Sequence, residues 1–237
     1  MKLKTALFLV MNGFASLTSS MAQSNIIQIS NQQKKVAITY SSAESKLAAE
    51  ILYSYLEKSL PNTFEIKDKN ITKSDAQIIL EIQKNNKELK DQEFILKSNS
   101  QDISLLATNL KSLKYAVYTL LEKWEFRKFT ATVSYIPKPD AFIFPKNFYQ
   151  KYQPTFAYRT LLFPDSYDQA FREWHKLDWF NDDFGLWGHT FDRLVPPKTH
   201  FKTNPKLYAL YEGKRRAESL CMTNDTVVEL LCSELKK

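Results

Sequence analysis

The pattern of apolar and polar positions predicts strands alternating with helices in the first part of the chain. Two segments, beginning at Ser41 and Ser112, place apolar residues three and four positions apart, as an amphipathic helix does. Ser41 and Glu44 form a helix-capping pattern, and Pro61 ends the first helix. Short apolar runs between polar turns are typical of strands. They lie at 36–40, 64–67, 76–82, 93–97, 103–108 and, by alternation, 129–136. We therefore expect an α/β layer in which helices cover a sheet.

Composition changes near residue 137. Prolines punctuate the stretch that follows, at Pro137, Pro139, Pro145 and Pro154. Five of the six arginines and three of the four tryptophans come after this stretch. We therefore expect an α/β domain at 25–145 and a second domain at 155–237, joined by a linker.

The second region contains the residues that suit binding chemistry. The apolar run at 156–163 predicts a buried strand with Arg159 in its middle. A buried guanidinium has to be paired, so Arg159 either holds a structural partner or faces a ligand pocket. A helix is expected at 167–178, and a second strand at 186–191. A last helix, capped by Thr223 or Asn224, should follow a strand at 219–223.

The N-terminus has the pattern of an export signal. Lys2 and Lys4 precede a mostly apolar stretch at 5–17, with small residues around Ala22. That stretch is too short to span a bilayer stably, and no later segment has transmembrane character. We therefore expect a signal peptide at 1–22, cut near Ala22, and a secreted or periplasmic protein without a membrane span.

Charge and composition narrow the class of partner. The formal net charge is +7, but the lysines are scattered, and only 214–216 forms a basic triplet. Nucleic-acid binding needs clustered basic residues with interleaved aromatics, so no nucleic-acid partner is expected. An anionic ligand stays open. Aromatic residues make up 14% of the chain, which suits sugar rings and also suits ordinary cores.

Cysteine and histidine usage gives no sign of a metal or cofactor. Only Cys221 and Cys232 are present, so no disulfide framework holds the fold, and both a bond between them and two free thiols remain open. His175, His189 and His200 are not at metal-ligand spacing. We expect neither a metal site nor a cofactor.

Two stretches resemble known families. Residues 170–231 read AFREWHKLDWFNDDFGLWGHTFDRLVPPKTHFKTNPKLYALYEGKRRAESLCMTNDTVVELL. Over about 155–237 the chain resembles a bacterial family of secreted proteins, domain of unknown function 4838. Upstream, the AVYTLLEKW helix and the strand pair before it resemble the N-terminal domain shared by family 67 α-glucuronidases and family 20 hexosaminidases.

The resemblance implies an N-terminal α/β sandwich-type domain followed by the first part of a TIM-type (β/α) barrel. It also implies hydrolysis or recognition of a polysaccharide or oligosaccharide, with an acidic glycan among the candidates. By this resemblance Arg159 corresponds to a sugar-contacting arginine, and Trp187, His189 and Thr190 contribute to the same pocket. Asn224 lies in the family's Thr-Asn-Pro turn. This chain departs from the family pattern with Asn204-Pro205 in place of the usual His-Pro and with Asp225 in place of the usual Pro, which are loop and cap changes.

Catalytic residues stay unassigned. Glycoside hydrolysis generally needs a carboxylic acid and a second group flanking the bond, and relatives place these on later barrel strands. The available carboxylates have no spacing in their favour: Asp165, Asp182, Asp183 and Asp192. We therefore expect a truncated glycosidase-like chain that lacks its catalytic acid. The alternatives are a non-catalytic carbohydrate-binding protein and an interaction module without a sugar function.

Overall fold

The computed structural model describes residues 25–32, 35–69, 77–179, 186, 188 and 190–236. The chain divides into two compact units, and the division falls between Leu177 and Asp178. The first compact unit therefore extends beyond the domain boundary expected between 145 and 155. Among the described residues, no helix is both long enough and apolar enough to cross a membrane.

The first unit is built on a six-stranded mixed sheet with the order β10-β5-β6-β4-β2-β3. Its strands are β2 (Val36–Tyr40), β3 (Phe64–Asp68), β4 (Gln77–Ile82), β5 (Phe94–Ser98), β6 (Ile103–Ala107) and β10 (Tyr149–Tyr152). The neighbours β3, β2, β4 and β6 run parallel, whereas β5 and β10 are antiparallel to the strands beside them. The α/β class predicted from the apolar pattern is confirmed.

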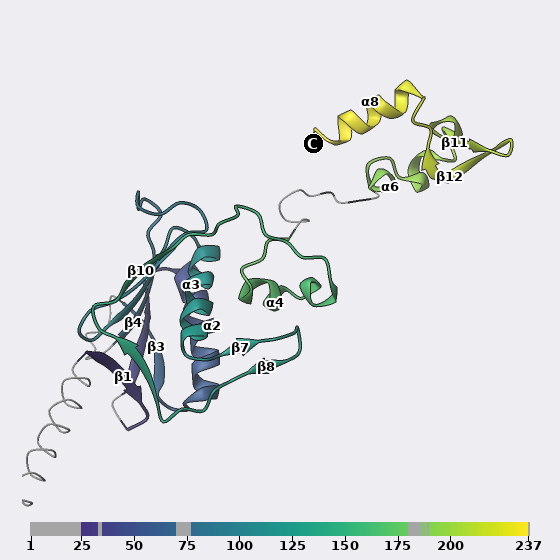
Figure 1. Cartoon of the computed structure of the whole chain (residues 1–237). Helices are drawn as coiled ribbons and strands as arrows, with labels where there is room; N and C mark the ends of the chain where they lie inside the picture. The colour runs from purple at the N-terminus through teal and green to yellow at the C-terminus, as the bar shows by residue number, and fades with distance from the viewer. Residues whose placement is uncertain are drawn as a thin grey trace, which may run out of the picture. The chain divides into compact units, whose positions relative to one another are not determined.

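Helices α2 (Ala43–Ser59) and α3 (Leu110–Lys123) pack against one face of this sheet (Figure 1). Alternate strand residues such as Ile38 and Leu80 are fully buried and share one core with Leu52 of α2 and Leu120 of α3. The apolar residues at every second strand position therefore pack against those at every third or fourth helix position.

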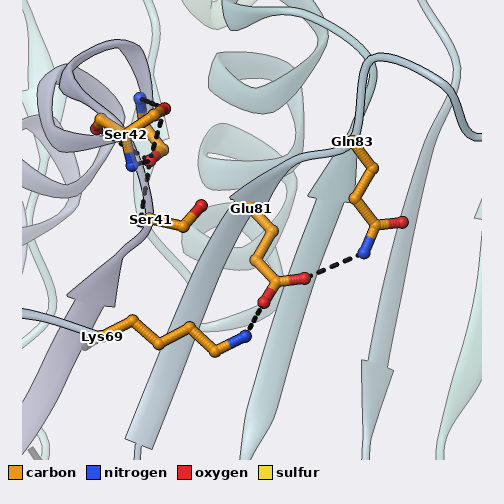
Figure 2. Close-up of polar contacts among 6 residues, drawn as sticks. Ser41, Ser42, Lys69, Glu81 and Gln83 are labelled. Atoms are coloured by element: carbon orange, nitrogen blue, oxygen red, sulfur yellow. Dashed lines mark hydrogen bonds and ion pairs between the residues drawn. The ribbon is translucent and has the colours of Figure 1, made fainter.

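Helix α2 begins one residue later than the capping pattern predicted. Ser42 is the N-cap, and its Oγ accepts from Ser45 N at 3.1 Å, while Ser45 Oγ accepts from Ser42 N at 2.9 Å. Figure 2 shows this cap and, on strand β4, Glu81, whose carboxylate accepts hydrogen bonds from Lys69 and, at 2.9 Å, from Gln83 Nε2. Ser45, at the third helical position, therefore completes the capping box in the place predicted for Glu44.

The stretch predicted as a linker contains strands. β9 (Ala141–Pro145) pairs antiparallel with β1 (Ile26–Ser30), and the side chains of Ile29 and Phe142 from this pair are buried in the core. The single strand expected at 129–136 is wrong. Two short strands, β7 (Arg127–Lys128) and β8 (Ser134–Tyr135), form a hairpin there, because Phe129 N bonds Val133 O at 2.9 Å and turns the chain back.

The strand expected at 156–163 is also wrong. This segment has no strand pairing among the described residues, and Phe156 and Leu162 are 69% and 56% exposed. After it come the 3₁₀ turn η1 (Pro164–Tyr167) and helix α4 (Gln169–Trp174), shorter than the helix predicted at 167–178. Trp174 is 2% exposed and packs against the rings of Tyr55 and Tyr118, so α4 is part of the first unit.

The second unit has a small core of its own. Its elements are α6 (Phe191–Leu194), α7 (Pro197–His200), η2 (Pro205–Leu207), β11 (Tyr208–Tyr211), β12 (Lys214–Leu220) and α8 (Asp225–Glu234). The core residues are Val195, Leu207, Tyr208, Leu220, Val227 and Leu231. The described strands of this unit form one antiparallel hairpin. Of the strand expected at 186–191, residues 187 and 189 lie outside the described residues, and Phe191 begins helix α6. The TIM-type barrel stays a prediction.

Candidate binding site

Arg159 joins three separate segments of the first unit. Its Nε donates to the Lys176 carbonyl at 2.9 Å, and its Nη1 donates to the Phe156 carbonyl at 2.6 Å. Its Nη2 donates to Gln92 Oε1 at 2.6 Å. The guanidinium carbon also lies 5.8 Å from the centre of the Tyr115 ring, within range of a cation–π contact. The fixed fork of arginine donors is therefore held in one orientation.

Two of the three partners of Arg159 have unusual backbone conformations. Gln92 and Lys176 have φ values of 64° and 58°, in the left-handed region that non-glycine residues seldom adopt. Lys176 follows His175, the C-cap of α4. Here Leu177 N donates to Arg172 O at 2.9 Å, and Lys176 N donates to Glu173 O at 3.2 Å. This is the usual way to end a helix, and it turns the Lys176 carbonyl toward Arg159.

A pocket of about 240 Å³ adjoins Arg159. Its lining combines aromatic and polar side chains: Gln92, Phe94, Tyr115, Tyr152, Gln153, Pro154, Arg159, His175 and Lys176. The rings of Phe94 and Tyr152 stack with centroids 4.7 Å apart. A pocket with apolar walls and a few convergent polar groups is the usual form of a small-molecule site.

Two lysines near the pocket form ion pairs. Lys176 Nζ pairs with Glu122 at 3.0 Å, and Lys151 Nζ pairs with Glu93 at 2.8 Å. Burial opposes ionisation of Glu93, but hydrogen bonds from Lys151 and the Lys90 backbone outweigh it and hold its pKa below the usual value. The three Arg159 acceptors described above are neutral, and arginine stays charged at physiological pH. Arg159 thus brings a permanent positive charge to the wall.

His175 forms another side of the pocket and is fixed from two directions. Its Nε2 lies 2.9 Å from the carbonyl oxygen of Lys128, which can only accept, so Nε2 carries the proton. Its ring lies 4.3 Å from that of Phe171. In the neutral form, Nδ1 of this ring is then a hydrogen-bond acceptor.

The remaining residues expected to bind a ligand have different places. Trp187 and His189 lie outside the described residues. Thr190 directly precedes α6 in the second unit, and its side chain makes no capping hydrogen bond. Asn224 caps α8: its Oδ1 accepts from Thr226 N at 3.0 Å, and its Nδ2 donates to the Lys206 carbonyl at 3.1 Å. Asn224 therefore has a structural role in this fold.

Most residues around Arg159 had no signal in the sequence. Gln92, Tyr115, Tyr152 and His175 come from four distant segments. His175 lies in the run that resembles the family but was not assigned a binding role, Tyr115 was not singled out, and Tyr152 lies in the stretch predicted as a linker. Long-range packing alone brings them together.

Metal and disulfide chemistry are not evident in the described part of the chain. Its residues contain no group of three His, Cys, Asp or Glu side chains able to hold a metal ion. Cys221 and Cys232 are free thiols. A hydrogen bond with Thr223 is the main cause that lowers the pKa of the Cys221 thiol.

The comparisons with known proteins bear on the second half of the chain. Residues 128–237 match a family model described as Domain of unknown function (DUF4838). The predicted resemblance of 155–237 to this family is confirmed, and the match begins further upstream, at β7. Among curated proteins, none matches the chain.

Solved glycosidases resemble parts of the chain at low identity. A mutant Streptomyces plicatus β-hexosaminidase with its product GlcNAc has a TM-score of 0.43 and 14% identity, over 57% of this chain and 24% of its own. An inactive GH20 exo-β-N-acetylglucosaminidase from Vibrio harveyi has a TM-score of 0.38 and 18% identity, over 57% of this chain and 18% of its own. A GH138 enzyme targeting pectin rhamnogalacturonan II has a TM-score of 0.36 and 12% identity, over 86% and 24%. The chain thus spans at most a quarter of these proteins' lengths.

Proposed function

We propose that this protein is a secreted glycan-binding protein of the glycosidase type, and that its first unit holds one sugar ring in the Arg159 pocket. The observation that carries the proposal is the pocket itself, with aromatic walls around a fixed guanidinium. The resemblance of the AVYTLLEKW helix to glycosidase N-terminal domains supports the same class of ligand.

The size and lining of the pocket suit a single ring. Pockets for drug-sized ligands have volumes of roughly 300–1,000 Å³, and this one is smaller, at about 240 Å³. A sugar ring offers C–H faces to aromatic side chains and hydroxyls to polar ones. Tyr115 and the Phe94–Tyr152 stack provide the aromatic surface, and Gln153 and His175 provide polar groups.

The charge of the pocket favours an acidic sugar. Arg159 carries a permanent positive charge at the wall, and a planar guanidinium matches a carboxylate in shape and charge. No Asp or Glu is among the described residues that line the pocket, so no carboxylate there repels an anionic ligand. A uronic acid residue of an oligosaccharide fits these conditions.

The same lining favours binding over cleavage at this pocket. Hydrolysis of a glycosidic bond needs a carboxylic acid beside it, and the described lining offers none. The non-catalytic alternative considered from the sequence is therefore the one that this pocket supports. A hydrolytic activity would depend on residues elsewhere.

Export is part of the proposal. Lys2, Lys4 and the apolar stretch at 5–17 form the signal pattern, and they lie outside the described residues. A secreted protein meets polysaccharides directly, which agrees with a sugar ligand.

Isothermal titration with a uronic acid trisaccharide tests the proposal. Arg159→Lys keeps the charge but loses the fork of donors, and we expect it to weaken binding at least tenfold, or about 1.4 kcal/mol. Arg127→Lys is a matched control, because Arg127 also donates to two carbonyls in this unit but does not line the pocket. Equal affinity in Arg159→Lys and wild type would contradict the proposal.

A further inference from the structure

The second unit contains a larger pocket with a different chemistry. Its volume is about 640 Å³. The lining comes from α6, the turn after it, β11 and β12, through Phe191, Asp192, Val195, Pro197, Tyr208, Ala217, Glu218, Ser219, Leu220 and Met222. None of these residues was assigned a binding role from the sequence, and the pocket lies wholly within the second unit.

The floor of this pocket is fixed by the core of the unit. Val195 and Tyr208 are each 1% exposed and belong to the core cluster. Tyr208 OH donates to the Val195 carbonyl at 3.2 Å, and the Phe201 ring packs edge-on against Tyr208 at 5.1 Å. Arg215 Nη1 donates to the Tyr208 carbonyl at 2.8 Å. The floor is therefore preformed.

The rim, by contrast, presents free polar groups and exposed apolar surface. Asp192, Glu218 and Ser219 are exposed, and within the described part of the chain their side chains make no hydrogen bond or ion pair. Phe191 and Met222 are 48% and 51% exposed. The pocket thus places the acceptor oxygens of Asp192, Glu218 and Ser219 beside the apolar surface of Phe191 and Met222. This arrangement matches a ligand that has hydrogen-bond donors at its edge and C–H groups on its face.

We propose that this pocket binds an uncharged sugar ring, at a site separate in kind from the Arg159 pocket. Sugar hydroxyls would donate to the Asp192 and Glu218 carboxylates while a C–H face lies on Phe191. Two carboxylates disfavour an anionic ligand. The exposed Phe191 and Met222 beside them favour a ligand with an apolar C–H face over a plain polycation. A hydroxyl-rich neutral ring meets both conditions.

The test is isothermal titration of the full chain carrying Arg159→Lys, so that the first pocket contributes little. The probes are the neutral tetrasaccharides of β-glucose, β-xylose, β-mannose and β-galactose. We expect saturable binding of at least one probe. Phe191→Ala and Asp192→Ala should each weaken it about fivefold, the size of one lost contact. Glu229→Gln, an exposed carboxylate on α8 that does not line the pocket, should leave it unchanged.

The isosteric pair Asp192→Asn and Glu218→Gln separates a neutral ligand from a cationic one. Amide oxygens still accept from hydroxyls, so sugar binding should fall less than in the alanine variants. Binding of tetralysine in place of any sugar would overturn the proposal, as would the absence of saturable binding to all four probes. Sugar binding that is insensitive to both Phe191→Ala and Asp192→Ala would overturn it as well. Because Arg159 belongs to the other unit, failure here leaves the proposed function standing.

Discussion

Arg159 shows how one side chain can hold a segment in place and also shape a pocket. Its Nε and Nη1 bonds go to the carbonyls of Lys176 and Phe156, so much of its capacity anchors the 156–177 stretch. Gln92 receives the third bond and donates its own Nε2 to Ala157 O at 2.8 Å. From the sequence, the structural and ligand-facing roles of Arg159 were alternatives. The hydrogen bonds show the structural role, and the ligand-facing role stays a proposal.

Glu173 gives a residue-scale prediction about pH. Burial opposes its ionisation, but hydrogen bonds from Lys114 Nζ at 2.7 Å and from Gln169 outweigh this and lower its pKa. A lowered folded-state pKa adds stability that is present above the usual glutamate value of about 4.3 and is lost as pH falls through the folded value. We expect Glu173→Gln to reduce the loss of stability on acidification below about pH 4.3.

Thermal unfolding followed between neutral and acidic pH measures this effect. Lys114→Met removes the main partner of Glu173 and should likewise reduce the loss of stability at acidic pH. The double variant should add little to either single change. If Glu173→Gln loses as much stability as wild type between neutral and acidic pH, Glu173 does not contribute to that loss.

Helices α2 and α3 and the central strands could be predicted well from local pattern. β2 was predicted with its observed bounds, and α3 within two residues at its N-terminus, because apolar spacing and turn residues agree with burial there. β10 could not be found this way, since this edge strand has the sequence Tyr-Gln-Lys-Tyr and is mostly exposed. The prediction of a strand at 156–163 was wrong for the opposite reason. Its apolar residues suggest a strand, but side chains of Arg159 and Gln92 take up its carbonyls.

Helix α4 provides a prediction at the scale of one element. Trp174 fixes α4 to the rings of Tyr55 and Tyr118, so Trp174→Ala should destabilise the first unit by about 3–5 kcal/mol. Leu162→Ala, at a 56% exposed position in the preceding segment, should change stability by less than about 0.5 kcal/mol. Urea unfolding followed by circular dichroism measures both, and a small effect at Trp174 would mean that α4 is not docked.

The cap of α8 provides a second prediction at this scale. Asn224→Ala removes the acceptor for Thr226 N and should cost about 1 kcal/mol of stability. Asn224→Asp keeps that acceptor and should recover most of the loss. If both variants keep full stability but lose sugar binding, Asn224 has the ligand-contacting role that the family resemblance implies, and the capping account is wrong.

At the scale of the whole molecule, the sequence indicated two regions, and the structure divides into two compact units at Leu177 and Asp178. Composition marks a stretch with four prolines, at 137–154, before five of the six arginines, whereas the compact unit includes the later segment that buries Trp174. That burial links residues more than a hundred positions apart, such as Tyr55 and Trp174, and no local pattern records it. The family match over 128–237 likewise crosses this division.

The division gives a testable prediction about fragments. Residues 25–177 expressed alone should unfold cooperatively in urea, because they keep the sheet, both covering helices and α4. Residues 25–154 lose Trp174 and the Lys114–Glu173 ion pair and should unfold at a lower urea concentration. Equal midpoints for the two fragments would place the structural boundary before residue 155.

The central claim is that the Arg159 pocket receives an acidic sugar ring, and a crystal structure of the chain with a uronic acid trisaccharide tests it most directly. The account predicts electron density for one ring between Tyr115 and Tyr152, with its carboxylate toward the Arg159 guanidinium. An empty pocket in crystals grown at a saturating trisaccharide concentration, or density for the sugar only at another surface, would contradict it.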